Sequence, residues 1–447
     1  MIKVAKFGGS SVANAKQFKK VRKIIREDAS RKVVVVSACG KEAGDDHKIT
    51  DLLYLCEAHI RYGVSWEEIF SMIENRYRSI KEDLNLNVDL ETEFAKIRSL
   101  MKPDTPTDYL VSRGEYLTAL CMAEYLGFEF ADAADVIAYQ YDGEIDMVRT
   151  QQLLQEKCQD GKGIVVPGFY GALPNGVIKV MSRGGSDITG AVLANVMDAD
   201  VYENWTDVSG FFVADPRIIH NPMQIPRINY SELREMSYMG ANILHDDAVF
   251  PVREKNIPIN VRNTNDPENH GTMILCDCSE LDEKDPPHPI TGITGRKDFT
   301  VITLVKSHTS GEVGYLRKLL AIFEEFHISI ESVPVTVDTF SVIVSTESID
   351  RCVYEIAARI RTELKPDDLR VEDHVALVAI VGRGMKEVPG MSGQLLSEFG
   401  RNKINIKVIS QTSDELCIVV GVMNRDFDKA IKCVYDRFIA TEKRKNA

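Results

Sequence analysis

Apolar, β-branched runs alternate with helical patterns through the first part of the chain. Each short run ends in a polar or glycine-containing turn, as strands buried in a parallel sheet do. Between the runs, apolar residues recur at helical spacing, for example Phe18, Val21 and Ile25. The predicted strands are residues 2–7, 32–36, 130–134, 163–166 and 201–205. The alternation predicts an α/β domain with helices covering a mostly parallel sheet.

One strand–turn–helix stretch in the middle of the chain concentrates polar chemistry. Val177–Met181 predicts a buried strand, and a glycine-rich turn, Ser182–Asp187, follows it. Ile188–Met197 has apolar residues at helical spacing, with Ser186 or Asp187 placed to cap the helix. A helix N-terminus beside an arginine favours an anion. An ordinary β–α turn whose glycines supply positive φ explains these residues equally well.

A second unit of this kind stands at the start of the chain. Ile2–Phe7 predicts a strand that ends at two glycines, and a helix follows with Ser10 or Ser11 as its cap. Lys6 lies near the end of this strand, where a lone lysine is usually a solvated surface charge. Neither turn matches a Walker P-loop or a dinucleotide fingerprint. Two glycine turns in one domain, one with a lysine and one with an arginine, are suited to phosphate chemistry.

The rest of the first domain is mainly helical. Residues 51–101 predict a helical segment that covers one side of the site, and Pro103 and Pro106 end it. Asp108–Leu126 predicts another helix, with Glu115 near its start. An acidic residue at such a position usually lies on the surface and compensates the helix dipole.

The C-terminal part of the chain contains an internal repeat. The segments GYLRKLLAIFEEFHISIESV and GMSGQLLSEFGRNKINIKVI superpose at one fixed offset, which pairs Gly314 with Gly390 and Phe323 with Phe399. Each copy predicts a βαββαβ unit. A polar, proline-rich stretch before the first copy predicts a domain boundary. The predicted domains are residues 1–285, 296–371 and 372–447.

Composition narrows the class of protein. With 44% apolar and 27% charged residues, the 447-residue chain has the make-up of a soluble globular protein. A net charge of −13 argues against a nucleic-acid partner. Nine cysteines lie scattered without metal-ligand spacing, and no apolar run has membrane-spanning length. We therefore expect a cytoplasmic protein without signal peptide, membrane partner or protein-held metal.

Four motifs resemble the signatures of the aspartate kinases, which belong to the amino-acid kinase superfamily. In order along the chain they are KFGGSSV at Lys6–Val12, SRGGSD at Ser182–Asp187, WTDV at Trp205–Val208 and ADPR at Ala214–Arg217. The resemblance implies the amino-acid kinase fold followed by two ferredoxin-like ACT units, the second completed by a strand from residues 289–295. It also implies ATP-dependent phosphorylation of the β-carboxylate of L-aspartate to 4-phospho-L-aspartate, the first step of lysine, threonine and methionine biosynthesis.

A carboxylate nucleophile sets simple demands on the site. Its reference pKa is near ~3.9, so it is ionised at neutral pH and needs no general base. Catalysis then rests on positioning and on cations around the transferring phosphoryl group. By the resemblance, Lys6 neutralises that group, Asp187 orients Lys6, and Mg²⁺ is held mainly by the nucleotide. The implied nucleotide-binding residues are Lys6, Phe7, Gly8, Gly9, Ser10, Thr206, Asp207, Phe212, Asp215 and Arg217.

The amino-acid substrate has its own set of implied contacts. Arg183 would hold the α-carboxylate with two parallel hydrogen bonds, and Glu115 would bind the α-ammonium group. The implied substrate-binding residues are Ser37, Thr50, Glu115, Arg183, Gly184, Gly185 and Ser186. Asn242 stands where many members of the family have a lysine that reaches the phosphates.

The two repeats differ where an effector would bind. Glu331 of the first copy is replaced in the second by Lys407. The candidate effector residues are Ser310, Gly311, Glu312, Glu331, Asp338 and Thr339. Because several are acidic, we expect lysine as feedback inhibitor at a homodimer seam, with threonine as second candidate and a tetramer as a further possibility.

Three alternatives stay open. The repeats can serve dimerisation alone. The chain can be an inactive amino-acid-sensing homologue, although it retains Lys6, Glu115, Arg183 and Asp187. It can also be a kinase for another amino-acid carboxylate.

Overall fold

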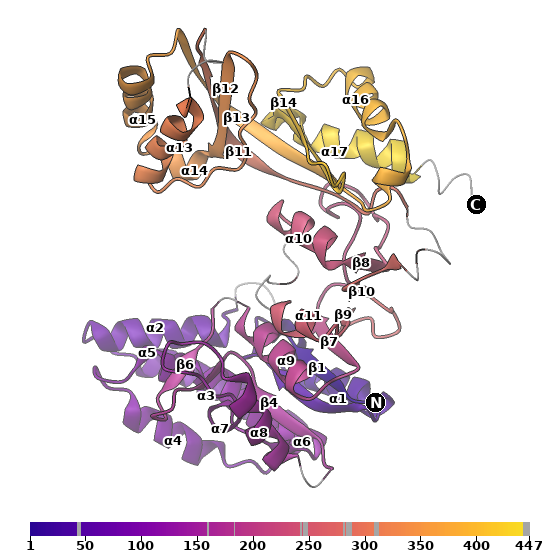
Figure 1. Ribbon diagram of the computed structural model, residues 1–447. Coiled ribbons are helices and arrows are strands. Elements are labelled where there is room, and N and C mark those ends of the chain that lie inside the picture. The colour runs from indigo at the N-terminus through magenta and orange to yellow at the C-terminus, as the bar shows by residue number, and fades with distance from the viewer. Residues whose placement is uncertain are drawn as a thin grey trace. The chain divides into compact units, whose positions relative to one another are not determined.

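The chain folds into two compact units in the computed structural model (Figure 1). The structure describes residues 1–42, 46–158, 161–182, 184–241, 244, 249–279, 282, 288–307 and 313–440. The first unit comprises Met1–Phe211, Gln224–Tyr230 and Ile243–Cys278. The second comprises Phe212–Met223, Ser231–Asn242 and Ser279–Ala447.

An eight-stranded sheet forms the centre of the first unit, in the order β3-β4-β2-β1-β7-β9-β10-β8. Its strands are β1 (Lys3–Phe7), β2 (Arg31–Val36), β3 (Glu129–Phe130), β4 (Ile164–Pro167), β7 (Val201–Thr206), β8 (Arg227–Asn229), β9 (Ile259–Asn263) and β10 (Thr272–Leu275). The β9–β10 pair is antiparallel and the other neighbours run parallel. The predicted α/β class and mostly parallel sheet are therefore confirmed.

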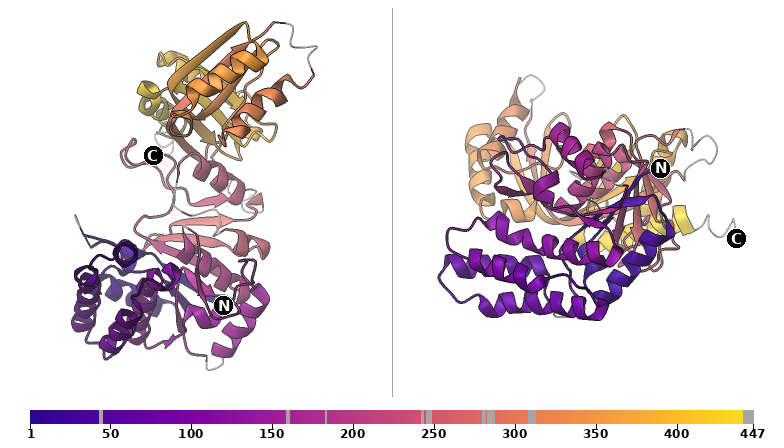
Figure 2. Two further views of the ribbon diagram at one scale, coloured as in Figure 1. Left: turned by 90° about the vertical axis from the view of Figure 1, so that its left-hand side faces the viewer. Right: turned by 90° about the horizontal axis from the view of Figure 1, so that it is seen from below.

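Helices cover the sheet of the first unit. They are η1 (Gly9–Val12), α1 (Ala15–Glu27), α2 (Ile49–Arg61), α3 (Glu67–Leu84), α4 (Leu90–Leu100), α5 (Thr107–Val111), α6 (Arg113–Leu126), α7 (Ala133–Val136), α8 (Met147–Lys157), α9 (Gly185–Val196) and α11 (Phe250–Glu254). Ala5, Phe7 and Trp205 pack into the core formed with α1, α3 and α6. Helices α2, α3 and α4 lie together as a bundle in Figures 1 and 2.

Two predicted helix caps are wrong because each helix begins at a different residue from the one predicted. Helix α1 begins only at Ala15, where the Asn14 side chain accepts a hydrogen bond from the N–H of Gln17. Ser10 and Ser11 lie in η1 instead, and the Ser11 hydroxyl makes a buried 2.7 Å hydrogen bond with that of Thr264. Helix α9 likewise starts at Gly185, after Gly184, so neither Ser186 nor Asp187 is its cap.

Several element boundaries also differ from the prediction. The helical segment 51–101 is three helices, and the helix expected over Asp108–Leu126 is broken at Ser112. The strand expected at Val177–Met181 is the short, half-buried β6 (Ile178–Val180). It pairs only with β5 (Tyr170–Ala172) in a two-stranded ribbon. Local apolar content therefore predicted a strand there, but not its separation from the main sheet.

A five-stranded antiparallel sheet, in the order β12-β11-β13-β15-β14, forms the second unit. Its strands are β11 (Gly292–Val305), β12 (Thr339–Ser345), β13 (Asp368–Val381), β14 (Val408–Gln411) and β15 (Cys417–Met423). Its helical elements are α13 (Tyr315–Glu325), α14 (Thr346–Ile349), α15 (Val353–Arg359), η4 (Ile360–Leu364), η5 (Met385–Glu387), α16 (Met391–Arg401), η6 (Asn424–Asp426), α17 (Phe427–Tyr435) and η7 (Asp436–Ala440). Helix α10 (Tyr230–Tyr238) belongs to this unit from Ser231 onward.

The two long strands join the two repeats. Gly292–Arg296 of β11 pairs with Leu377–Val381, whereas Phe299–Val305 pairs with the earlier half of β13, Asp368–Val375. Each half of the shared sheet thus receives a segment of both long strands. The predicted pair of βαββαβ units is confirmed as a fold.

Within the described residues, no helix combines the length and apolar character needed to cross a bilayer.

Candidate active site

A cavity of about 860 Å³ lies in the first unit where parallel strands end and helices begin. Its walls come from the carboxyl ends of β1, β2 and β7 and from the starts of α2, α6 and α9. The lining residues are Lys6, Gly8, Gly9, Ser10, Ser37, Ala38, Cys39, Gly40, Lys41, Lys48, Thr50, Asp51, Glu115, Phe169, Gly184, Gly185, Ser186, Asp187, Thr206 and Asp207. This edge of a parallel sheet is the usual place for a ligand.

The cavity brings together most of the predicted site residues of the first unit. Phe7 is the exception, because strand alternation directs its side chain away from that of Lys6. The Phe7 ring is fully buried and stacks on Trp205, with ring centroids 5.9 Å apart. The Phe7 side chain therefore packs in the core and does not reach a ligand in this cavity.

Other predicted residues lie elsewhere. Phe212, Asp215 and Arg217 belong to the second unit, where the Arg217 guanidinium donates to the Asp215 carboxylate at 2.6–3.0 Å. Arg183 and Asn242 lie outside the described residues. The same holds for Ser310, Gly311 and Glu312 among the effector candidates.

A buried charge pair occupies the floor of the cavity. The Lys6 ammonium lies 2.5 Å from Asp187 Oδ1, and the two side chains are 9% and 15% exposed. The Asn204 amide donates to the same oxygen at 2.9 Å. In addition, the Tyr202 hydroxyl donates to the backbone carbonyl of Asp187 at 3.1 Å. Strand β7 therefore holds both the backbone and the carboxylate of Asp187.

Glu115 is a buried carboxylate on the cavity wall. Burial raises its pKa to about 8, although the backbone N–H groups of Ala38 and of Glu115 itself act in the opposite direction. Its Oε2 has no hydrogen-bond partner among the described residues. Gly114 allows the start of α6 to pack closely against Ala38, because a Cβ on Gly114 would lie 2.8 Å from the Ala38 side chain. Glu115 is therefore not a surface acid of the kind usual at a helix start, and the site favours a bound cationic group.

The start of α9 uses its two glycines differently. Gly184 has φ of 79°, a conformation that other residues rarely adopt. A Cβ on Gly185 would lie 2.7 Å from the Phe169 ring and 2.9 Å from the Met181 Cβ. The first glycine therefore makes the turn, and the second allows the first turn of the helix to approach Phe169.

The turn after β1 is hydrogen-bonded into the domain on both sides, since the Gly9 carbonyl accepts from the Gly40 N–H at 2.9 Å. The Gly8 N–H donates to the Trp205 carbonyl at 3.0 Å, so it is not available to a phosphate oxygen. The N–H groups of Gly9 and Ser10 donate to none of the described backbone acceptors outside this turn. Gly9 also packs closely on the next turn, because its Cβ would lie 2.9 Å from the Ala38 carbonyl.

The sequence prediction missed several residues of the cavity. Lys41, Lys48 and Asp51 line it from the turn and helix after β2. Phe169 does so with φ of 79°, a strained value for an aromatic residue and one that clusters at functional sites. Cys39 also contributes, but burial raises its thiol pKa to about 11, so it is no nucleophile at neutral pH. The strand end at Pro167-Gly168 was the available signal for Phe169.

Family models match both parts of the chain. Residues 1–263 match the amino acid kinase family, and residues 378–438 match the ACT domain. The parallel sheet and the glycine turns at its carboxyl edge agree with the first match. The chain therefore belongs to the amino acid kinase family.

Individual relatives narrow this class. Aspartokinase 3 of Bacillus subtilis is 33% identical over 98% of this chain and 99% of its own length. The aspartate kinase structure from Clostridium acetobutylicum has a TM-score of 0.89 and 42% identity, over 98% of this chain and 99% of that one. Aspartokinase III of Escherichia coli, solved with lysine and aspartate in the T-state, has a TM-score of 0.76 and 25% identity at the same coverages. Within the family, this chain is an aspartate kinase.

Proposed function

We propose that the chain transfers the γ-phosphoryl group of ATP to the β-carboxylate of L-aspartate, forming 4-phospho-L-aspartate. The observation that carries this proposal is one cavity with two opposite electrostatic features. Lys6 supplies a buried cation, and Glu115 supplies a buried carboxylate with an unpaired oxygen. An amino-acid dicarboxylate that receives a phosphoryl group requires both.

Lys6 acts on the transferring phosphoryl group. Its ammonium is held by Asp187 at the end of β1, so the cation is placed before the substrates arrive. The β-carboxylate of aspartate is already ionised, and the site therefore has no need of a base. The chain's contribution is to bring this carboxylate in line with the γ-phosphoryl group and to screen their mutual repulsion.

Glu115 binds the α-ammonium group of aspartate. A carboxylate with an unpaired buried oxygen gains both a hydrogen bond and a counter-charge from that ammonium. Arg183 holds the α-carboxylate in the same proposal. The remaining substrate contacts come from Ser37, Thr50, Gly184, Gly185 and Ser186.

The nucleotide lies along the turn after β1 and the end of β7. Gly9 and Ser10 offer backbone N–H groups, and Thr206 and Asp207 line the adjoining wall. The proposed nucleotide-binding residues also include Phe212, Asp215 and Arg217, which are assigned from the resemblance to the aspartate kinases. The Asp207 carboxylate is a hard oxygen donor of the type that Mg²⁺ prefers, so the cavity fits a nucleotide-bound magnesium ion. When bound, that ion neutralises charge on the phosphate oxygens.

An assay of ADP formation tests the reaction. We expect ADP only when L-aspartate, ATP and magnesium are all present, together with an acyl phosphate that hydroxylamine traps as a hydroxamate. Turnover with glutamate or acetylglutamate in place of aspartate would identify a kinase for another carboxylate. Binding of aspartate without ADP formation would identify an amino-acid-sensing homologue.

Lysine is the proposed feedback inhibitor, bound at the first repeat by Glu331, Asp338 and Thr339, with Ser310, Gly311 and Glu312. The complex of E. coli aspartokinase III with lysine supports this choice. In this chain the Glu331 carboxylate already accepts a hydrogen bond from the Tyr238 hydroxyl at 2.7 Å and lies 3.5 Å from Arg296. A bound ammonium group would therefore compete with the chain's own groups.

Titration of lysine into the assay tests the regulation. We expect inhibition that Glu331→Ala moves to higher lysine concentration, on a scale of about 1–3 kcal/mol of coupling. Inhibition by threonine alone would identify the second candidate. No inhibition by either amino acid at millimolar concentration would leave the repeats a role in assembly alone.

The wider context of the enzyme is proposed on the same basis. The reaction opens lysine, threonine and methionine biosynthesis, in the cytoplasm, and the division into residues 1–285, 296–371 and 372–447 separates catalysis from regulation. The repeats join two copies in a homodimer, which can pair further into a tetramer.

A further inference from the structure

Asn204 places a neutral amide beside the charge pair on the cavity floor. The register of the sheet sets Lys6 of β1 directly opposite Asn204 of β7, so both side chains point to the same face. Asn204 is 3% exposed, and its amide lies 2.9 Å from Asp187 Oδ1, the oxygen that Lys6 also contacts. Two donors from neighbouring strands therefore converge on one carboxylate oxygen.

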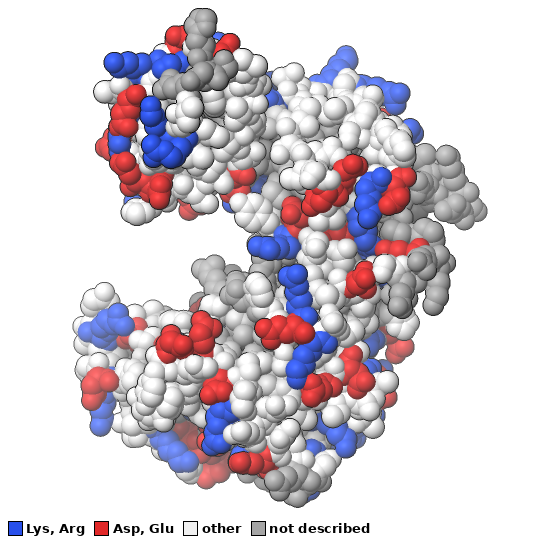
Figure 3. All heavy atoms as spheres, viewed as in Figure 1, with Lys and Arg blue, Asp and Glu red and all other residues white. Residues whose placement is uncertain are grey.

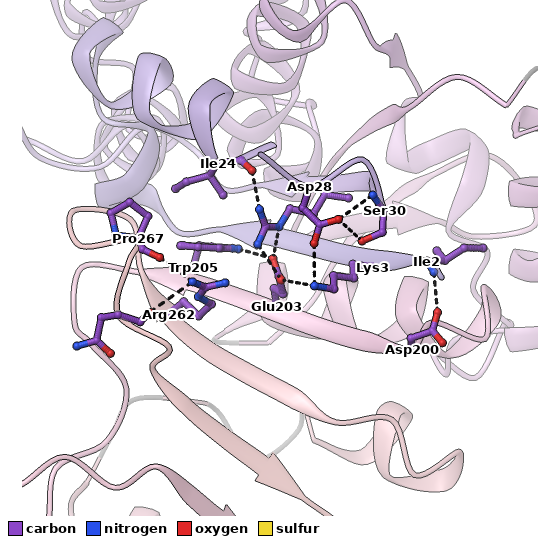
Figure 4. A network of polar contacts seen from close by, with 12 residues as sticks. Ile2, Lys3, Ile24, Asp28, Ser30, Asp200, Glu203, Trp205, Arg262 and Pro267 are labelled. Carbon is purple, nitrogen blue, oxygen red and sulfur yellow. Dashed lines mark hydrogen bonds and ion pairs between the residues drawn. The ribbon is translucent and has the colours of Figure 1, made fainter. Parts of the chain in front are cut away.

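The opposite face of β7 fixes the backbone that carries Asn204. The buried carboxylate of Glu203 accepts hydrogen bonds from Arg31 at 2.7 and 3.1 Å and from the Trp205 indole at 2.9 Å, and Lys3 lies 3.5 Å away (Figure 4). The Trp205 ring in turn has Arg262 4.5 Å from its centroid. Because its two flanking residues are held in this way, Asn204 has little freedom to move away from Asp187.

The chemistry of an amide suits this position. Without it, Lys6 would be the remaining side-chain partner of the Asp187 carboxylate within the described residues. With it, an amide and an ammonium share Oδ1, so the carboxylate is oriented by two donors rather than one. A charged side chain at position 204 would instead change the net charge around Lys6 and Asp187.

We propose that Asn204 is a positioning residue for phosphoryl transfer: it orients the Asp187 carboxylate so that Lys6 presents its ammonium to the transferring group. The inference rests on the proposed reaction, in which Lys6 acts on that group. Asn204 itself is not among the residues that line the cavity.

The test compares Asn204→Leu and Asn204→Asp in the full chain. Leucine preserves the volume and removes the donor, so kcat should fall roughly tenfold or more at every pH, the usual scale for a hydrogen bond to a charged group. The KM values for aspartate and ATP should stay within about twofold, because the lost interaction acts in the transition state.

Asn204→Asp distinguishes positioning from packing. Among the described residues, the titratable groups bonded around this position are Lys6, Asp187 and Tyr202. A second carboxylate beside Asp187 has a raised pKa, so at low pH it keeps a proton and donates to Oδ1 as the amide does. As the pH rises through that pKa the donor is lost, and kcat relative to the unaltered chain should fall. A purely structural role predicts equal relative loss at every pH.

Asn195→Leu is the matched control. Asn195 is a buried asparagine of α9, and its amide donates to the Pro251 carbonyl at 2.6 Å. Its loss should lower the melting temperature and leave kcat unchanged.

Near-normal kcat in Asn204→Leu, or a pH-independent relative loss in Asn204→Asp, would overturn the inference. If Asn204→Leu does not fold, the pH profile of Asn204→Asp decides alone. Lack of aspartate-dependent ADP formation by the unaltered chain would instead reject the proposed reaction.

Discussion

Lys6 and Asp187 form a buried pair in which each group needs the other. Removal of either one leaves an unpaired charge at a site that is 9–15% exposed. We therefore expect Lys6→Ala or Asp187→Ala to lower kcat by about a hundredfold or more and also to lower the melting temperature. The double variant should regain stability without regaining kcat.

Lys96→Ala provides the control for this pair. Lys96 is 61% exposed and pairs with Glu93 on the surface, where such pairs contribute little. Neither kcat nor melting temperature should change. Near-normal kcat in Lys6→Ala would remove Lys6 from the mechanism.

Glu115 makes stability and substrate binding depend on pH in opposite ways. Its pKa of about 8 in the folded protein exceeds the ordinary value of 4.5. Between these values the folded chain keeps a proton that the unfolded chain has lost, so rising pH lowers stability until about pH 8. Without substrate, Glu115→Gln should therefore melt higher than the unaltered chain at pH 8 and equally at pH 4.

The KM for aspartate provides the second measurement at this residue. Because the ionised form binds the ammonium group, KM should fall as pH rises from 6 to 8, and Glu115→Gln should raise KM and remove this dependence. A difference in melting temperature that is the same at pH 4 and pH 8 would contradict the assignment.

At the scale of elements, the start of α9 is held by close packing rather than by a side-chain cap. A Cβ on Gly185 would meet the Phe169 ring at 2.7 Å, and both residues line the cavity. Gly185→Ala should therefore displace the helix start, lower kcat and raise the KM for aspartate. Gly393→Ala is the control, because its Cβ in α16 would meet nothing within 4 Å. It should be neutral or stabilising by up to about 1 kcal/mol. Unchanged kinetics in Gly185→Ala would show that the turn has room to adjust.

At the scale of the whole molecule, the distribution of surface side chains bears on assembly. Acidic and basic side chains are interspersed on both units in Figure 3, although the net charge is −13. Apolar side chains are also exposed in the segment that pairs with the outer side of β12: Val335, which bridges Phe340, is 47% exposed, and Val337 is 73% exposed. An exposed apolar segment beside a sheet edge is suited to pairing with a second copy.

Val337→Asp tests the proposed homodimer. We expect the full chain to sediment as a dimer or larger, and Val337→Asp to shift it towards the monomer, because a charge would be buried at the seam. Val148→Asp in the first unit is the control, since Val148 is 68% exposed on α8. A monomeric unaltered chain would contradict the dimer, and an unaffected dimer would place the seam elsewhere.

The sequence by itself determined the order of elements, the parallel sheet, the repeated C-terminal units and most of the cavity residues. This information is local: β-branched runs, helical spacing and glycine turns reflect the backbone conformations of neighbouring residues. The resemblance to the aspartate kinases supplied the roles of the cavity residues, among them Glu115, for which the local pattern alone suggested a surface acid. The binding roles of all these site residues and of the effector residues stay predictions, and Arg183, Ser310, Gly311 and Glu312 lie outside the described residues.

Only the tertiary structure decided which groups meet. Asn204 became visible as a partner of Asp187 through the register between β1 and β7, which joins residues far apart in the chain. Packing on both faces of β1 placed the Phe7 ring in the core, whereas Lys6, on the other face, lines the cavity. The Ser11 hydroxyl, expected to cap a helix, is hydrogen-bonded to that of Thr264 instead. The burial of Glu115 likewise depends on several elements that pack around it. Pairing partners, desolvation and free hydrogen-bonding groups are properties of packed surfaces, so no local pattern contains them.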